Sequence, residues 1–147
     1  MPPDEQPAIT LAAIEHGKAL FCEKPLAASA EVAAKIDDAA TRANTIGMVN
    51  FEFLDTPGWQ TVKQIVDAGE LGPLQTLNAT WRVLTYANQH RLHNWKTDAG
   101  RGGGTLGNFV SHVFYYLEQL AGRITRLHAR LRNTAEPILH GETIVDL

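Results

Sequence analysis

The feature that most constrains this fold is the alternation of helical and short apolar segments over the first fifty residues. A helical pattern over residues 4–16 ends at Gly17, and the apolar run 19–22 follows it. A second helical pattern begins after the N-cap Ser29, and a second strand is predicted over residues 48–53. Helices that alternate with short strands predict a parallel α/β sheet, with the run 19–22 buried on both faces.

The pattern changes near Asp55. Pro57 is predicted to open a third helix that ends at Gly69. Residues 74–86 alternate with period two, which predicts a long strand with one covered face. The rest should form a polar loop, a fourth helix and two strands (87–101, 102–120, 124–132 and 143–147). The expected fold class is therefore α/β followed by α+β, with both ends of the chain interrupted.

Composition excludes several classes of partner. Among 147 residues, 13 Lys and Arg face 16 Asp and Glu, and this net charge of -3 argues against nucleic acid and anionic membranes. No apolar run is long enough for a membrane span, and the N-terminus does not resemble a signal peptide. The lone Cys22 excludes an internal disulfide and fits the cytoplasm. No histidine pair has helical metal-ligand spacing, so no metal is expected.

The first candidate site is Glu23-Lys24-Pro25, directly after the first predicted strand. Open α/β sheets bind ligands at the carboxyl ends of their strands. The Lys24 ammonium could donate a proton or hold a substrate oxygen there. From position alone, a solvated lysine in a strand-to-helix loop is the more frequent outcome.

The second candidate is the fourth helix, where Asn108, His112 and Tyr115 lie opposite the apolar stripe. A substrate could approach the backbone of Gly102-Gly103-Gly104 closely, with His112 as general acid or base. An ordinary solvated face is an equally good interpretation. The three glycines alone indicate a flexible loop into a helix, since they follow a predicted polar loop and lack the strand that precedes a nucleotide-binding loop.

These motifs resemble the glucose-fructose oxidoreductase and inositol dehydrogenase family, Gfo/Idh/MocA, over essentially the whole chain. The matching segments are CEKPLA after a strand (residues 22–27), ELG at 70–72, GGGTL at 102–106 and SH at 111–112. The resemblance implies the C-terminal remnant of a Rossmann-type dinucleotide-binding domain in residues 1–54. It implies the first part of an open-sheet substrate domain in residues 55–147, truncated at its C-terminus.

The resemblance also implies the site residues. Lys24 would orient both the substrate and NAD or NADP, with Glu23 and Pro25 supporting the cofactor and a cis Lys24–Pro25 bond. His112 would exchange the proton as hydride moves. Asn108 and Trp95 would complete the binding site for a sugar, cyclitol or related polyol.

Three departures from the family pattern qualify these expectations. Asn108 stands where many members have an acid, and an amide can hydrogen-bond but cannot transfer a proton. Tyr115 replaces a frequent Asp, and Glu52-Phe53-Leu54 replaces a segment with Arg. No GxGxxG directly follows a predicted strand, so the loop that would hold the pyrophosphate is missing and we expect a fragment of an NAD(P)-dependent oxidoreductase.

A rival hypothesis from another class is a non-catalytic relative that acts as a sugar-binding or protein-interaction module. Its interaction face would use the aromatic residues Trp81, Tyr86 and Trp95, which could equally belong to the core or to a subunit interface. Family members often pair through the C-terminal sheet, so a homo-oligomer is a further expectation.

Overall fold

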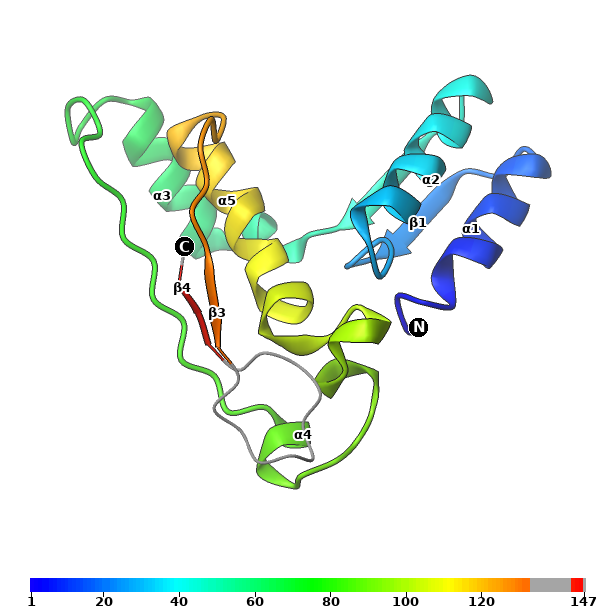
Figure 1. The fold of residues 1–147 in the computed structure, drawn as a ribbon. Helices are drawn as coiled ribbons and strands as arrows, with labels where there is room; N and C mark the ends of the chain where they lie inside the picture. Colours follow the sequence, from blue (N-terminus) through cyan, green and yellow to red (C-terminus); the bar gives the residue numbers. More distant parts are fainter. Residues whose placement is uncertain (133–143, 147) are drawn as a thin grey trace.

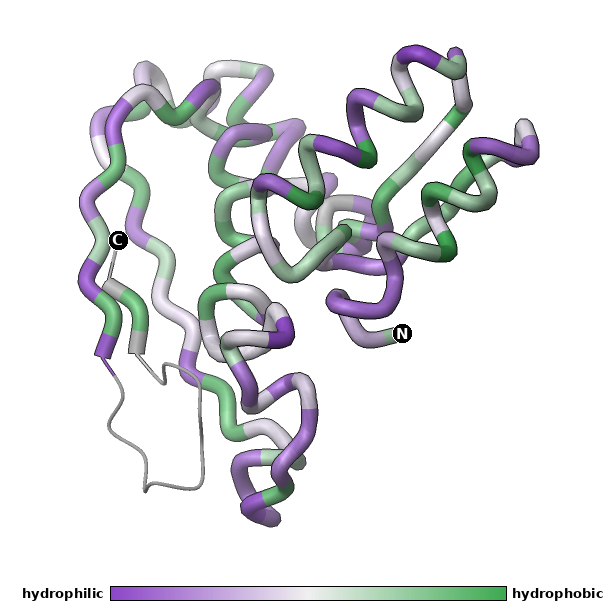
Figure 2. The backbone as a smooth tube through the Cα atoms, turned by 45° about the vertical axis from the view of Figure 1, so that its right-hand side comes forward, coloured by the Kyte–Doolittle hydropathy of each residue, from purple (hydrophilic) through white to green (hydrophobic). Residues whose placement is uncertain are grey.

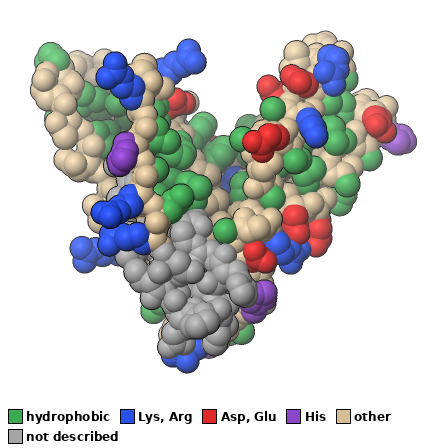
Figure 3. Space-filling model, in the orientation of Figure 1, with side chains coloured by type: hydrophobic (Ala, Val, Ile, Leu, Met, Phe, Trp, Pro, Cys, Tyr) green, Lys and Arg blue, Asp and Glu red, His purple; other side chains and the backbone are tan. Residues whose placement is uncertain are grey.

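The computed structural model describes residues 1–132 and 144–146, which form two lobes separated by an open notch (Figures 1 and 3). The first lobe holds helices α1 and α2 and strands β1 and β2. The second lobe holds helices α3, α4 and α5 and the hairpin of β3 and β4. No helix in the described ranges is both long enough and apolar enough to cross a membrane.

The first lobe confirms the predicted alternation of helices and strands. Its elements follow the chain in the order α1 (Gln6–Glu15), β1 (Leu20–Glu23), α2 (Ala30–Arg42) and β2 (Gly47–Asn50). The two strands pair in parallel, from Leu20 opposite Gly47 to Glu23 opposite Asn50. The carboxyl ends of β1 and β2 therefore lie side by side.

The core of this lobe lies on one side of the sheet. Ile14 of α1, Ile36 of α2 and Ala27 form a buried cluster. On the other side, Phe21 is 68% exposed and Met48 is 60% exposed. The prediction that the first strand is buried on both faces is therefore wrong within the described residues, because both helices cover the same face.

The second lobe is built from α3 (Pro57–Asp67), α4 (Tyr86–Gln89), α5 (Ser111–Ala121), β3 (Arg130–Arg132) and β4 (Ile144–Asp146). The strands β3 and β4 are antiparallel. Short helical turns connect these elements at Glu52–Asp55 (η1), Trp95–Thr97 (η2), Ala99–Arg101 (η3) and Leu106–Val110 (η4). Two of the turns, with α4, occupy the region predicted as an irregular polar loop.

Several predicted strands are shorter than expected. The second strand ends at Asn50 because η1 begins at Glu52, and the strand predicted over 124–132 is paired only from Arg130. The last predicted strand is confirmed as β4. Strand length depends on the neighbouring strand as well as on the alternating pattern.

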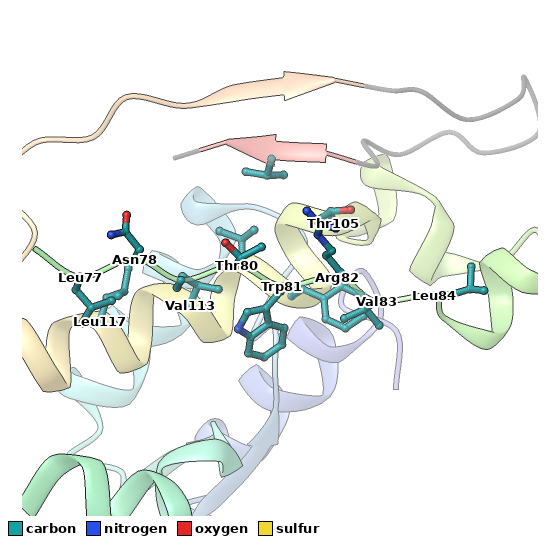
Figure 4. A pocket seen from close by; sticks show the side chains of 14 residues that line it. Leu77, Asn78, Thr80, Trp81, Arg82, Val83, Leu84, Thr105, Val113 and Leu117 are labelled. Atoms are coloured by element: carbon teal, nitrogen blue, oxygen red, sulfur yellow. The ribbon is translucent and has the colours of Figure 1, made fainter.

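The segment 74–84 is the largest difference from prediction. Its residues alternate in hydropathy (Figure 2), yet it pairs with no strand in the described part of the chain. It runs along a groove of about 940 Å³ between α5 and the hairpin (Figure 4). At its end, Thr85 caps α4 by accepting a hydrogen bond from Asn88 N at 3.0 Å. Tyr86 is therefore the first residue of a helix, not the last residue of a strand.

Candidate active site

Lys24 joins the two lobes. It follows β1, and its Nζ donates a hydrogen bond to the Asn108 backbone oxygen at 2.6 Å. The side-chain Oδ1 of Asn108 lies 3.4 Å from the same Nζ. The peptide bond between Lys24 and Pro25 is cis, as the family resemblance implies. The alternative of a freely solvated lysine is wrong, because this side chain is half-buried and has a specific partner.

A turn of π-helix presents Asn108 to Lys24. The sequence predicts one continuous helix to residue 120, but residues Leu106–Val110 form a π-helical turn before α5 begins at Ser111. A π-turn interrupts the regular hydrogen-bond ladder of an α-helix, and such turns are frequent at functional sites. The carbonyl that Lys24 binds belongs to this turn.

Burial and nearby charged groups shift the pKa of Lys24, some downwards and others upwards. Burial is the main cause that lowers the pKa of Lys24; Lys96 lowers this pKa further, while Glu52 and Glu23 raise it. One amide holds both carboxylates, since Asn50 Nδ2 donates to Glu23 Oε1 at 3.1 Å and to Glu52 Oε2 at 3.5 Å. The Lys24 ammonium therefore lies in a partly desolvated site with two carboxylates nearby.

His112 is buried among aromatic rings and is only 4% exposed. Its ring centroid lies 4.5 Å from that of Phe53, 5.7 Å from that of Phe51 and 6.4 Å from that of Trp81. The expectation of a polar face is therefore wrong for His112. The segment after β2 and the extended segment 74–84 cover this side of α5. The periodicity of the helix sequence does not predict that these two segments pack against it.

Burial keeps the His112 imidazole neutral. The pKa of His112 is lowered from 6.5 to about 4, mainly by burial and then by the Lys24 charge, against a smaller opposing effect of Glu23. Its Nδ1 is buried and has no hydrogen-bond partner among the residues the structure describes. At neutral pH this side chain is therefore unprotonated, and its low pKa makes it a weak base.

The three consecutive glycines are buried and tightly packed. A Cβ on Gly103 would lie 1.9 Å from the Trp95 backbone oxygen, and a Cβ on Gly102 would lie 2.8 Å from Ala28 Cα. Gly102 also has a φ of 83°. Both earlier interpretations, a flexible loop and an open approach for substrate, are wrong, because these glycines allow protein backbones to pack closely.

Gly103→Ala is expected to lower the free energy of unfolding by about 3 kcal/mol, because the clashing atoms belong to backbone and cannot rotate away. Urea unfolding measures this change. Gly58→Ala is the matched control, since a Cβ there meets nothing within 4 Å. Equal stability of the Gly103→Ala and Gly58→Ala variants would contradict the packing argument.

The three aromatic residues of the predicted interaction face differ in burial. Trp81 is half-buried in the cluster around His112, and Trp95 is half-buried with Lys96 Nζ 5.8 Å from its ring centroid. Tyr86 is 70% exposed. Only one of the three is therefore exposed.

Sequence reasoning missed four residues near Lys24, namely Gln6, Asn50, Glu52 and Lys96. The sequence did contain a signal for Asn50 and Glu52. Asn50 ends the strand paired with β1, Glu52 follows that strand, and parallel strands bring their carboxyl ends together. Gln6 and Lys96 carry no comparable signal, because tertiary contacts alone bring them to the site.

Comparison with protein families identifies the chain. Residues 59–146 match the GFO/IDH/MocA C-terminal domain. Residues 1–51 match the oxidoreductase family described by its NAD-binding Rossmann fold. The chain belongs to the Gfo/Idh/MocA family of oxidoreductases, which confirms the resemblance seen in the sequence motifs.

Individual relatives are much longer than this chain. An uncharacterized oxidoreductase of Synechocystis is 35% identical over 119 residues, which are 81% of this chain and 32% of that protein. Levoglucosan dehydrogenase of Pseudarthrobacter phenanthrenivorans is 30% identical over 124 residues, which are 84% of this chain and 32% of that protein. The chain spans about a third of the length of these curated relatives.

A solved structure supports the same assignment. Levoglucosan dehydrogenase in complex with NADH and levoglucosan has a TM-score of 0.75 to this chain at 26% sequence identity. The similarity covers 90% of this chain and 36% of that one. The described fold is therefore of the Rossmann type found in this family of dehydrogenases.

Proposed function

We propose that this protein is an NAD(P)-dependent dehydrogenase of a sugar, cyclitol or related polyol. The observation that carries the proposal is the position of the Lys24 ammonium, at the carboxyl end of β1 and 2.6 Å from the Asn108 carbonyl oxygen. Asn108 lies in the turn η4, which leads directly into α5, the helix that carries His112. The relation to levoglucosan dehydrogenase supports a cyclic polyhydroxylated substrate.

The proposal includes a division of the chain at residue 54. Residues 1–54 would be the C-terminal part of the dinucleotide-binding domain. Residues 55–147 would begin the open-sheet substrate and oligomerisation domain. The direct contacts between Lys24 and Asn108 would then cross the boundary between cofactor and substrate domains.

The chemistry of the described residues fits the nicotinamide end of NAD or NADP. Lys24 has three ammonium protons, of which Asn108 binds one closely, so a donor remains for a ligand oxygen. Glu23 and Pro25 would shape the cofactor side of this turn. The GxGxxG spacing at residues 102–107 follows the turn η3 and not a strand, and its glycines are packed against protein backbone, so it does not form a pyrophosphate-binding loop. When bound, the nicotinamide supplies hydride transfer.

Lys24 and the side chains around it would bind the substrate and transfer its proton. Lys24 would donate a hydrogen bond to the substrate oxygen and fix its position. The neutral His112 imidazole would accept the hydroxyl proton during oxidation, as a weak base whose pKa is lowered by burial. Asn108 would hydrogen-bond the substrate without exchanging a proton, and Trp95 would flank the sugar. Asn108 is bound to Lys24, and no observation favours a non-catalytic module over this arrangement.

The proposal is tested with the complete gene product, mixed with NAD or NADP and with levoglucosan, myo-inositol or glucose. We expect absorbance of the reduced nicotinamide to appear with at least one of these polyols and not in their absence. A gene product that neither binds nicotinamide cofactor nor oxidises any sugar or polyol would contradict the proposal.

Two further expectations stay predictions. The lone Cys22 favours a reducing compartment such as the cytoplasm. Pairing of subunits through the C-terminal sheet would appear as a mass of at least two chains in light scattering of the complete gene product.

A further inference from the structure

Gln6 is a buried polar residue with no part in the proposed chemistry. It lies in the first turn of α1 and is 5% exposed. Its side-chain Nε2 lies 2.8 Å from Glu23 O, 3.1 Å from Leu26 O and 3.3 Å from Pro25 O. These acceptors come before and after Lys24 in the chain, so one amide binds the backbone on both sides of the lysine.

We infer that Gln6 is a positioning residue that fixes the backbone from which Lys24 reaches its site. The inference rests on the proposed function of Lys24. A lysine side chain is long and has many rotamers, so its ammonium is placed accurately only if the backbone that carries it is fixed. The Gln6 amide supplies two N–H groups to carbonyls that would otherwise have to find partners in a partly buried turn.

Neighbouring contacts hold Gln6 itself in place. The Gln6 backbone N–H donates to Pro2 O at 3.1 Å, and the Thr10 hydroxyl donates to Gln6 O at 2.9 Å. The same hydroxyl lies 3.7 Å from Cys22 Sγ in β1. Gln6 is therefore fixed relative to the strand that ends just before Lys24.

The start of α1 also contacts the lobe that carries Asn108. Arg101 Nε donates to Asp4 Oδ2 at 2.6 Å, and a Cβ on Gly102 would lie 2.9 Å from Pro3 Cβ. The ion pair is exposed and contributes little by itself, whereas Pro3 is fully buried. Residues 2–6 therefore touch the lobes on both sides of the hydrogen bond between Lys24 and Asn108.

The test is a double-mutant cycle in the complete gene product. Gln6→Met keeps the length of the side chain and removes the donor. We expect kcat to fall by about 10- to 100-fold, the cost of displacing a reacting group by roughly 1 Å, with a smaller change in KM. In a Lys24→Met background the same substitution should change kcat by less than about twofold, because its effect passes through the lysine.

A matched control separates this role from a general loss of a hydrogen bond. Gln60 is an exposed glutamine on α3 whose Nε2 donates to Asp55 O at 3.3 Å. Gln60→Met should leave kcat unchanged. If Gln6→Met lowers kcat equally with and without Lys24, the positioning role is overturned.

A second readout does not depend on activity. Trace acylation of lysine amines, followed by mass spectrometry, measures how accessible and how mobile each amine is. Gln6→Met should raise the acylation of Lys24 several-fold relative to the exposed Lys35. Unchanged acylation of Lys24 in a folded variant would overturn the inference. If no polyol is oxidised by the wild type, the proposed function fails, and acylation still decides whether Gln6 positions Lys24.

Folding is monitored by urea unfolding of each variant. If Gln6→Met does not fold, Gln6→Asn replaces it, since it keeps the amide but shortens its reach by one methylene. Gln6→Asn should raise Lys24 acylation in the same direction by a smaller factor. Acylation equal to the wild type in that variant would contradict the role of Gln6.

Discussion

Lys24→Met in the complete gene product is expected to lower kcat for polyol oxidation by about 1,000-fold, within the range by which a positioned acid–base or hydrogen-bonding group accelerates a reaction. The reason is geometric. The Lys24 ammonium is half-buried, is held by the Asn108 carbonyl at 2.6 Å, and is the only lysine placed at the carboxyl end of a described strand. Steady-state rates with saturating cofactor and polyol measure the effect.

Two further substitutions make this result specific. Lys35→Met removes an exposed ammonium on α2 and should leave kcat unchanged. Lys24→Arg keeps the charge, but its planar guanidinium presents donors in a different geometry and should restore little activity. If Lys24→Met retained the wild-type rate, the lysine would have no catalytic part, and the non-catalytic alternative would gain support.

Local signals predicted two helices that follow Lys24 in the chain. Ser29 caps α2, with Val32 N 3.4 Å from its hydroxyl, and Pro57 opens α3. These signals operate within one turn of chain, so the sequence contains all that they require. The position of Lys24 followed from the general rule for strand ends in α/β sheets.

Contacts between distant segments could not be predicted in the same way. Asn108 was a candidate, but its bond to Lys24 joins residues 84 positions apart and depends on a π-turn in place of regular helix. The burial of His112 depends on Phe51 and Phe53, which reach α5 from the end of β2. Periodicity indicates which side of a helix is polar, but it does not show what covers that side.

The glycines of residues 102–104 show the same division. Their sequence was consistent with a mobile loop or with an open approach to the backbone, and both interpretations use only the properties of the glycines themselves. The structure shows a different reason for glycine at these positions, because Gly103 is packed against the backbone of residues 95–98 and Gly102 is packed against Ala28. Only the folded arrangement of three segments reveals that no side chain fits there.

The stability of the protein is expected to fall as the pH decreases from about 6.5 to about 4, through His112. Its pKa is 6.5 in the reference state and about 4 in the folded state. Between these values the unfolded state binds a proton that the folded state does not, so the free energy of unfolding rises with pH. The contribution of His112 lost between pH 7 and pH 5 is about 2 kcal/mol.

Urea unfolding at several pH values checks this prediction, with His112→Phe as the test variant. Phenylalanine keeps an aromatic ring among Phe51, Phe53 and Trp81 and cannot be protonated. The difference in unfolding free energy between variant and wild type isolates His112 from other titrating groups. His128→Gln, a substitution of an exposed histidine, should keep the wild-type pH dependence. Parallel curves for His112→Phe and wild type would show that His112 is not held neutral by burial. A steeper loss in the wild type would mean that the same burial which keeps this imidazole unprotonated at neutral pH also limits the acidity that the fold tolerates.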